Sequence, residues 1–89
     1  MKSEQITIVN KLGLHARAAA KLVQLSSQFD ADITLEKMGE VADAKSIMDV
    51  LMLAGTKDSV LTVKAEGNDE DAALSEICAL FGNKFGEDE

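Results

Sequence analysis

Apolar and polar residues alternate in several short stretches of the chain, which is typical of strands that bury one face. These stretches are residues 5–9 (QITIV), residues 32–36 (DITLE) with a return strand at Val41 and Ala42, and residues 60–65 (VLTVKA). A turn at residues 38–40 (MGE) makes the two middle strands a hairpin. The alternation thus predicts four strands.

Apolar residues also recur at steps of three and four, which is the spacing of an amphipathic helix. Residues 16–28 are rich in helix formers, and their repeat consists of Ala19, Leu22, Val23, Ser26 and Phe29. The stretch 67–71 (GNDED) opens a last helix, because its acidic residues suit the positive end of the helix dipole. The inner stripe of that helix consists of Ala73, Leu74, Ile77, Leu80 and Phe81.

A shorter helix is predicted between the hairpin and the last strand. Ser46 stands at an N-cap position before IMDVLMLAG, Asp49 falls in the first turn, and Gly55 is suited to the C-cap. This segment has more apolar residues than one face of two turns can bury, so we expect part of them to be exposed. Core packing explains such a run, and so does a Met- and Leu-rich surface for several partners.

The predicted order of elements is β-α-β-β-α-β-α, within a single domain of residues 1–89. One-sided strands favour an antiparallel sheet with helices on one face, which is an α+β two-layer sandwich. A ferredoxin-like domain also suits this order, and the order of the strands in the sheet stays open. Residues 86–89 (GEDE) are expected to be a solvated end.

Charge and composition exclude several functions. The chain has 16 acidic and 9 basic residues, a formal net charge of -7, which disfavours binding to nucleic acid or anionic membranes. Cys78 is the only cysteine and His15 the only histidine, so we expect neither an internal disulfide nor a metal site. No apolar run approaches the roughly 20 residues of a membrane span, and the amino terminus lacks a signal-peptide core. We therefore expect a cytoplasmic protein with no cofactor.

The single histidine lies where a helix begins. In NKLGLHARAAA, His15 takes the N-cap position, so the N–H groups of Ala16, Arg17 and Ala18 have no partner inside the helix. These donors, the helix dipole and the Arg17 guanidinium together favour an anion such as phosphate. A neutral imidazole is a good nucleophile near pH 7 and afterwards a good leaving group. The stretch therefore predicts a reversible phosphoryl carrier.

The alternative is that His15 and Arg17 are ordinary surface residues without a chemical role. Ser and Asp are better N-caps than His, and positive charge is unfavourable at a helix N-terminus, so the pair indicates a functional site. A hydrolase is disfavoured, because no second acid–base group lies near His15 in the sequence.

Four segments carry a resemblance to a known family: NKLGLHARAAAKL, AKSIMDVLMLAG, AEGNDEDAAL and ALFGNKFGEDE. The chain resembles the HPr-type phosphocarriers of the bacterial phosphoenolpyruvate-dependent phosphotransferase system, and most of all their nitrogen-branch members. The resemblance implies an open-faced β-sandwich, with four antiparallel strands and three helices on one face. It also implies that His15 takes a phosphoryl group on Nδ1 from enzyme I and passes it to an enzyme IIA domain, with Arg17 binding the phosphate. Such a protein carries the group and is not itself an enzyme.

Two further residues stand out against the family pattern. Ser46 falls where some relatives undergo regulatory phosphorylation by a dedicated kinase, although a plain N-cap explains the same serine. Relatives usually carry proline directly after the arginine, where this chain has Ala18. Alanine keeps the N–H that proline lacks, so we expect Ala18 to offer an additional donor to the imidazole or its phosphate.

Partners are expected to dock on apolar surface beside the histidine, formed by Ala16, Ala20, Ile47, Met48 and Leu51. The rim of this surface is expected at Lys21, Gln24 and Lys45. Because Gln24 and Asp49 make it less basic than in many HPr proteins, the surface favours a nitrogen-branch or otherwise specialised enzyme IIA. The chain is expected to act as a monomer.

Two other functions remain open. One is a regulatory protein of the same fold that acts by docking, with phosphorylation only adjusting the contact. The other is an acyl carrier modified on Ser46, which the predicted strands disfavour because acyl carriers are all helical.

Overall fold

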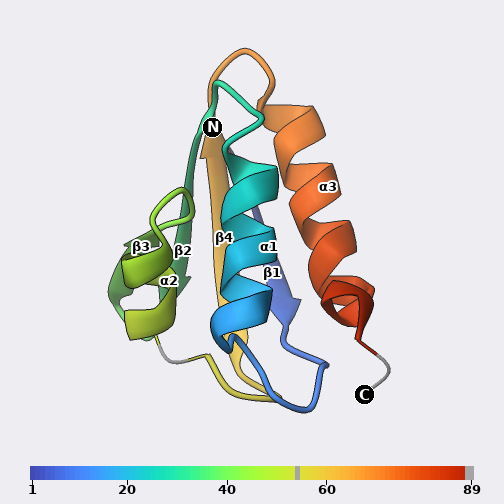
Figure 1. The fold of residues 1–89 in the computed structure, drawn as a ribbon. Helices are drawn as coiled ribbons and strands as arrows, with labels where there is room; N and C mark the ends of the chain where they lie inside the picture. Colours follow the sequence, from blue (N-terminus) through green and yellow to red (C-terminus); the bar gives the residue numbers. More distant parts are fainter. Residues whose placement is uncertain (54, 88–89) are drawn as a thin grey trace.

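The computed structural model describes residues 1–53 and 55–87, and Figure 1 shows its chain trace. The elements are β1 (Lys2–Thr7), α1 (Ala16–Ser26), β2 (Asp32–Lys37), β3 (Glu40–Asp43), α2 (Ile47–Met52), β4 (Val60–Glu66), α3 (Glu70–Gly82) and the 3₁₀ turn η1 (Lys84–Gly86). Their order confirms the β-α-β-β-α-β-α prediction.

The four strands form one antiparallel sheet in the order β1-β4-β2-β3, so β4 pairs with both β1 and β2. All three helices lie on one face of this sheet (Figure 1). The opposite face carries polar cross-strand neighbours such as Thr34 beside Lys64, and Lys64 Nζ lies 3.0 Å from Glu36 Oε1. The open-faced α+β sandwich is therefore confirmed, and the strand order is the part that the sequence left open.

Some element limits differ from the prediction. The first strand spans Lys2–Thr7 rather than residues 5–9, because Lys2 pairs with Ala65 across the β1–β4 ladder. β1 lies at the edge of the sheet and its residues are largely exposed, so its polar beginning carries no alternation for a pattern to detect. Ile8 is still fully buried, and its N–H donates to Ser59 O at 2.9 Å.

The predicted ends of two helices were also wrong. α1 ends at Ser26, where the Ser27 N–H caps it by donating to Val23 O, and a turn follows in place of the predicted last residues. The C-cap of α2 is Leu53 rather than the predicted Gly55, because the Leu53 N–H closes the helix on Asp49 O at 3.1 Å. α2 is consequently short, with 6 residues, and Ile47, Met48, Leu51 and Met52 are exposed.

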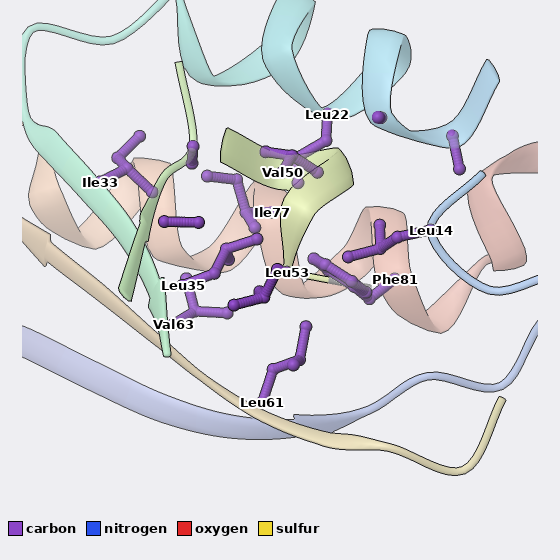
Figure 2. Packing of buried hydrophobic residues seen from close by; sticks show 14 of the residues in the cluster. Leu14, Leu22, Ile33, Leu35, Val50, Leu53, Leu61, Val63, Ile77 and Phe81 are labelled. Atoms are coloured by element: carbon purple, nitrogen blue, oxygen red, sulfur yellow. The ribbon is translucent and has the colours of Figure 1, made fainter. Parts of the chain in front are cut away.

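The core lies between the sheet and the helices and consists almost entirely of aliphatic side chains. Figure 2 shows Leu22 of α1, Val50 of α2 and Ile77 of α3 converging on Leu35 and neighbouring strand residues. Of the predicted stripes, Ala19, Leu22, Ser26, Ala73, Leu74, Ile77 and Phe81 are buried, whereas Val23, Phe29 and Leu80 are only partly buried. The first turn of α1 is held in place because Ala18 and Ala19 are both fully buried against this core.

Candidate functional site

The loop before α1 is fixed by a close approach to the segment that follows α2. The Leu14 N–H donates to Gly55 O at 2.8 Å. Gly13 has φ of +66°, and a Cβ atom there would lie 2.4 Å from Gly55 O, so only glycine fits. The buried Asn10 also closes the loop, because its Nδ2 donates to Gly13 O at 2.8 Å. The backbone that enters His15 therefore has little freedom.

His15 is the N-cap of α1, as predicted. Its backbone is extended, with φ of -79° and ψ of 177°, and its carbonyl accepts the first helical bond from the Ala19 N–H at 2.8 Å. The N–H groups of Ala16, Arg17 and Ala18 precede that bond and have no intrahelical acceptor. No acidic residue stands in the first turn of α1, and the His15 side chain makes no cap hydrogen bond to these amides. Three donors are thus left for an incoming anion.

The imidazole instead contacts a carboxylate from the other end of the described chain. His15 Nε2 is paired with Glu87 Oε2, and Asn10 Nδ2 donates to Glu87 Oε1 at 3.1 Å. Burial alone raises the pKa of Glu87, but the hydrogen bonds from His15 and Asn10 and the charge of Lys21 hold that pKa below its ordinary value. Glu87 is therefore an anion at neutral pH and lies directly against the ring.

Glu87 corrects two expectations. Residues 86–89 were predicted to be a solvated end, yet the Glu87 side chain is only 15% exposed and is hydrogen-bonded, while residues 88–89 lie outside the described chain. An acid–base group also does lie near His15, at a separation of 72 residues that local spacing cannot reveal. Neither Glu87 nor Asn10 carried a sequence signal for the site.

Arg17 and the two lysines of the predicted rim differ in their surroundings. Arg17 is exposed, and its guanidinium makes no hydrogen bond or ion pair with residues 1–53 or 55–87. Lys21 donates to Phe85 O at 2.6 Å, and Lys45 donates to Phe29 O at 2.8 Å, so both ammonium groups hold the fold together. Of the rim residues, only Gln24 is fully exposed. The free positive charge beside the helix start belongs to Arg17.

Ser46 is the N-cap of α2, as predicted. Its Oγ accepts from the Asp49 N–H at 3.3 Å, and its carbonyl accepts from the Val50 N–H at 3.1 Å. The Ser46 hydroxyl thus caps α2, which is the structural role expected of this serine apart from any phosphorylation.

α2 presents an apolar surface next to α1, against which it packs. Val50 is fully buried, whereas Met48 is 64% and Met52 is 74% exposed. The predicted docking residues Ile47 and Leu51 are exposed as well. Met52 was not among the predicted docking residues, because its place in the apolar run does not show which face of the helix it occupies.

None of the helices in residues 1–53 and 55–87 is long and apolar enough to cross a membrane. The same part of the chain contains no group of three His, Cys, Asp or Glu side chains arranged to hold a metal ion.

The fold and the site together define the class of the protein. An antiparallel sheet with its helices on one face, and a histidine at the N-cap of the first helix, is the architecture of a phosphocarrier. The family model PTS-HPr, described as "PTS HPr component phosphorylation site", matches residues 2–83. The chain is 47% identical to phosphocarrier protein HPr of Xylella fastidiosa over 88 residues, with 99% of each chain covered. It is 51% identical to phosphocarrier protein NPr of Shewanella violacea over 83 residues, covering 93% of this chain and 91% of that one.

The fold leads to the same family. The crystal structure of HPr-C-His from Thermoanaerobacter tengcongensis superposes with a TM-score of 0.97 at 43% identity, and 100% of both chains is covered. The chain therefore belongs to the HPr family of the phosphotransferase system, as a phosphocarrier rather than an enzyme.

Proposed function

We propose that His15 is the phosphoryl acceptor of this phosphocarrier, taking the group on Nδ1 from enzyme I and giving it to an enzyme IIA domain. The proposal rests on one observation about the two ring nitrogens. Nε2 is paired with Glu87, which leaves Nδ1 as the nitrogen for a phosphoryl group. The Nδ1 lone pair forms the new P–N bond while the donor's own bond to phosphorus breaks. Transfer to the acceptor repeats this exchange in the opposite sense.

The start of α1 supplies what the phosphate needs. Ala16, Arg17 and Ala18 offer backbone donors at the positive end of the helix dipole, and no acidic side chain in the first turn opposes an anion. Arg17 adds a mobile positive charge that suits phosphate oxygens. Phosphoryl transfer demands mostly positioning and charge stabilisation from a protein, so this small set suffices when a partner covers the site.

Partners dock on the exposed apolar surface that α1 and α2 share, which is formed by Ala16, Ala20, Ile47, Met48, Leu51 and Met52. Ala16, Ile47, Met48, Leu51 and Met52 are exposed, and Ala20 is partly exposed. Large apolar side chains with flexible Met among them adapt to more than one binding surface. Enzyme I and enzyme IIA therefore use the same surface in turn, in a cytoplasmic relay of monomers.

The proposal is tested by incubating the chain with enzyme I and phosphoenolpyruvate. The expected product carries one phosphate on His15 that is labile in acid and stable in alkali, as located by ³¹P NMR and tandem mass spectrometry. His15→Ala takes up none, whereas Ser46→Ala is labelled as fully as the wild type. Acid-stable label on Ser46 alone would overturn the proposal, and a pantetheine adduct in the intact mass would favour an acyl carrier.

A docking regulator of the same fold gives a different outcome in cells. If docking alone carries the function, His15→Ala complements a strain that lacks the protein. If the phosphoryl group carries it, His15→Ala fails while Ser46→Ala succeeds.

The narrower assignment to the nitrogen branch is supported by the 51% identity to the Shewanella violacea NPr. We expect the phosphorylated chain to discharge faster to a nitrogen-branch enzyme IIA than to a sugar-specific one. Equal or reversed rates, measured with both acceptors at the same concentration, would place it with the sugar-transport carriers. Regulation at Ser46 is a separate proposal, and a kinase would first have to break the Oγ contact with the Asp49 N–H.

A further inference from the structure

Glu87 is held against the imidazole by more than one contact. One carboxylate oxygen is paired with His15 Nε2, and the other accepts from Asn10 Nδ2 at 3.1 Å. Asn10 is itself fully buried and bonded to Gly13 O. With both oxygens engaged, the carboxylate has one orientation toward the ring.

The backbone before Glu87 adopts an uncommon conformation to reach the site. Lys84 and Phe85 both have φ of 56° and Gly86 has φ of 77°, so three successive residues lie in the left-handed region. For the two non-glycine residues this conformation costs about 1 kcal/mol or more each, and it persists only where the surroundings impose it. The tail is therefore not an extended end that meets His15 by chance.

The burial of Phe85 and a hydrogen bond from Lys21 impose this conformation. The Phe85 side chain is 1% exposed, and its ring meets Phe81 edge-on with centroids 4.9 Å apart. The Phe85 carbonyl accepts from Lys21 Nζ at 2.6 Å, which ties the turn to α1 itself. The segment that carries Glu87 is thus anchored to the same helix that His15 begins.

The carboxylate determines how protons are placed on the ring. An ionised carboxylate only accepts hydrogen bonds, so the proton between the two groups belongs to His15 Nε2 and the Nδ1 of the neutral ring keeps its lone pair. When Nδ1 takes a phosphoryl group, the electron pair of the broken bond to phosphorus stays on the donor and the Nε2 proton does not move. The phosphorylated ring then carries a positive charge, and that charge faces Glu87.

We propose that Glu87 is a positioning residue for phosphoryl transfer: it orients the imidazole and stabilises the positive charge of the phosphorylated ring. This inference rests on the proposed role of His15 as the acceptor. Glu87 holds Nε2, and the unpaired donors of the α1 start directly follow His15 in the chain, so the charged ring meets a negative group and its phosphate meets positive ones. Glu87 thereby shifts the transfer equilibrium toward this chain.

The test measures that equilibrium with the full chain. Glu87→Gln keeps the size of the side chain, an acceptor oxygen for His15 Nε2 and the packed Phe85. It removes the charge and replaces the oxygen that accepts from Asn10 with an NH2 group. We expect the equilibrium constant for transfer from phosphorylated enzyme I, measured by ³¹P NMR, to fall on the order of 3- to 10-fold, as for a charge-assisted hydrogen bond made neutral. Glu76→Gln makes the same change of charge at an exposed site on α3 and leaves the constant unchanged.

A second measurement separates positioning from folding. In ¹H–¹⁵N spectra of the free chain, the His15 Nε2–H is expected to exchange slowly with water in the wild type and in Glu87→Gln, and rapidly in Glu87→Ala. If Glu87→Gln has the equilibrium constant of Glu76→Gln, or if Nε2–H exchange is equally fast in all variants, the inference is overturned. A wild-type chain that takes up no phosphoryl group overturns the proposed function itself, and does so before any variant is compared.

Discussion

The starts of α1 and α2 use opposite arrangements. Ser46 closes α2 with a hydroxyl that accepts from the Asp49 N–H, and Asp49 adds negative charge to the first turn. His15 makes no such bond in α1, and Arg17 places positive charge where it is unfavourable. The first turn of α2 is thus capped by a side chain of the chain itself, whereas the first turn of α1 has no side-chain cap.

The difference raises the question of how α1 remains stable without a good N-cap. A good N-cap stabilises a helix by about 1 kcal/mol, and α1 gives up that stabilisation at His15. The helix is retained because Ala18 and Ala19 in its first turn are fully buried. Tertiary packing therefore compensates for the missing side-chain cap of α1.

The most decisive change is His15→Ser, which converts the start of α1 into the kind found in α2. Phosphoryl uptake from enzyme I should fall to background, because no nucleophilic ring remains. The free energy of unfolding should change by less than about 1 kcal/mol, since serine is a preferred cap but the Glu87 carboxylate loses its contact with His15. Urea denaturation and ³¹P NMR test both parts. Phosphate uptake at the wild-type rate by this variant would mean that the acceptor lies elsewhere.

Arg17→Ala removes the positive charge while leaving the helix start unpaired. We expect kcat/KM for phosphorylation by enzyme I to fall on the order of 10- to 100-fold, the loss of one strong charge-assisted contact to phosphate. Stability should change by less than about 0.5 kcal/mol, because the exposed guanidinium makes no contact within the described chain. Gln28→Ala, at an exposed position beyond the end of α1, is the control and should leave the rate unchanged. An unaltered rate in Arg17→Ala would remove it from the site.

Met48→Glu tests the apolar surface of α2. With Met48 64% exposed, the fold should tolerate the charge, and kcat/KM for transfer should fall by about 10-fold through weaker docking. Met38→Glu is a matched control, because Met38 is 95% exposed in the hairpin turn. Stopped-flow transfer rates and circular dichroism separate the outcomes. Unfolding of Met48→Glu would assign this side chain to the core.

How much of this arrangement follows from the sequence depends on the range of the interactions. Features governed by near neighbours in the sequence were predicted, including the N-cap positions of α1 and α2, which are His15 and Ser46. The position of β4 between β1 and β2 was not, because pairing partners leave no trace in local periodicity. Glu87 was missed for the same reason: its approach depends on the burial of Phe85 and on a bond from Lys21.

Ser46→Ala should destabilise the start of α2 and leave the start of α1 unchanged. The Asp49 N–H loses its acceptor, so the free energy of unfolding should fall by about 1 kcal/mol. Ser46→Asn keeps a side-chain acceptor and should restore most of the loss. Phosphorylation of His15 should proceed at the wild-type rate in both variants, and a slowed transfer in Ser46→Asn would indicate that the Ser46 position itself meets the partner.

Ala18→Pro is expected to have the smallest effect, and it changes a residue in the first turn of α1. The Ala18 N–H precedes the first intrahelical bond, so proline removes no helix contact and the domain should still fold. Loss of one donor to phosphate, worth about 1 kcal/mol, corresponds to a transfer rate lower by about 5-fold. Identical transfer kinetics in the two proteins would show that this N–H takes no part.

The helix-free face of the sheet has a practical consequence. Thr34, Thr62 and Lys64 alternate with buried residues along β2 and β4, so they lie on this face. The helices cover the opposite face (Figure 1). A dye or a surface tether attached at Thr62 would leave the imidazole and the apolar helix surface unobstructed. Successive donor and acceptor encounters of one immobilised molecule are therefore open to direct observation.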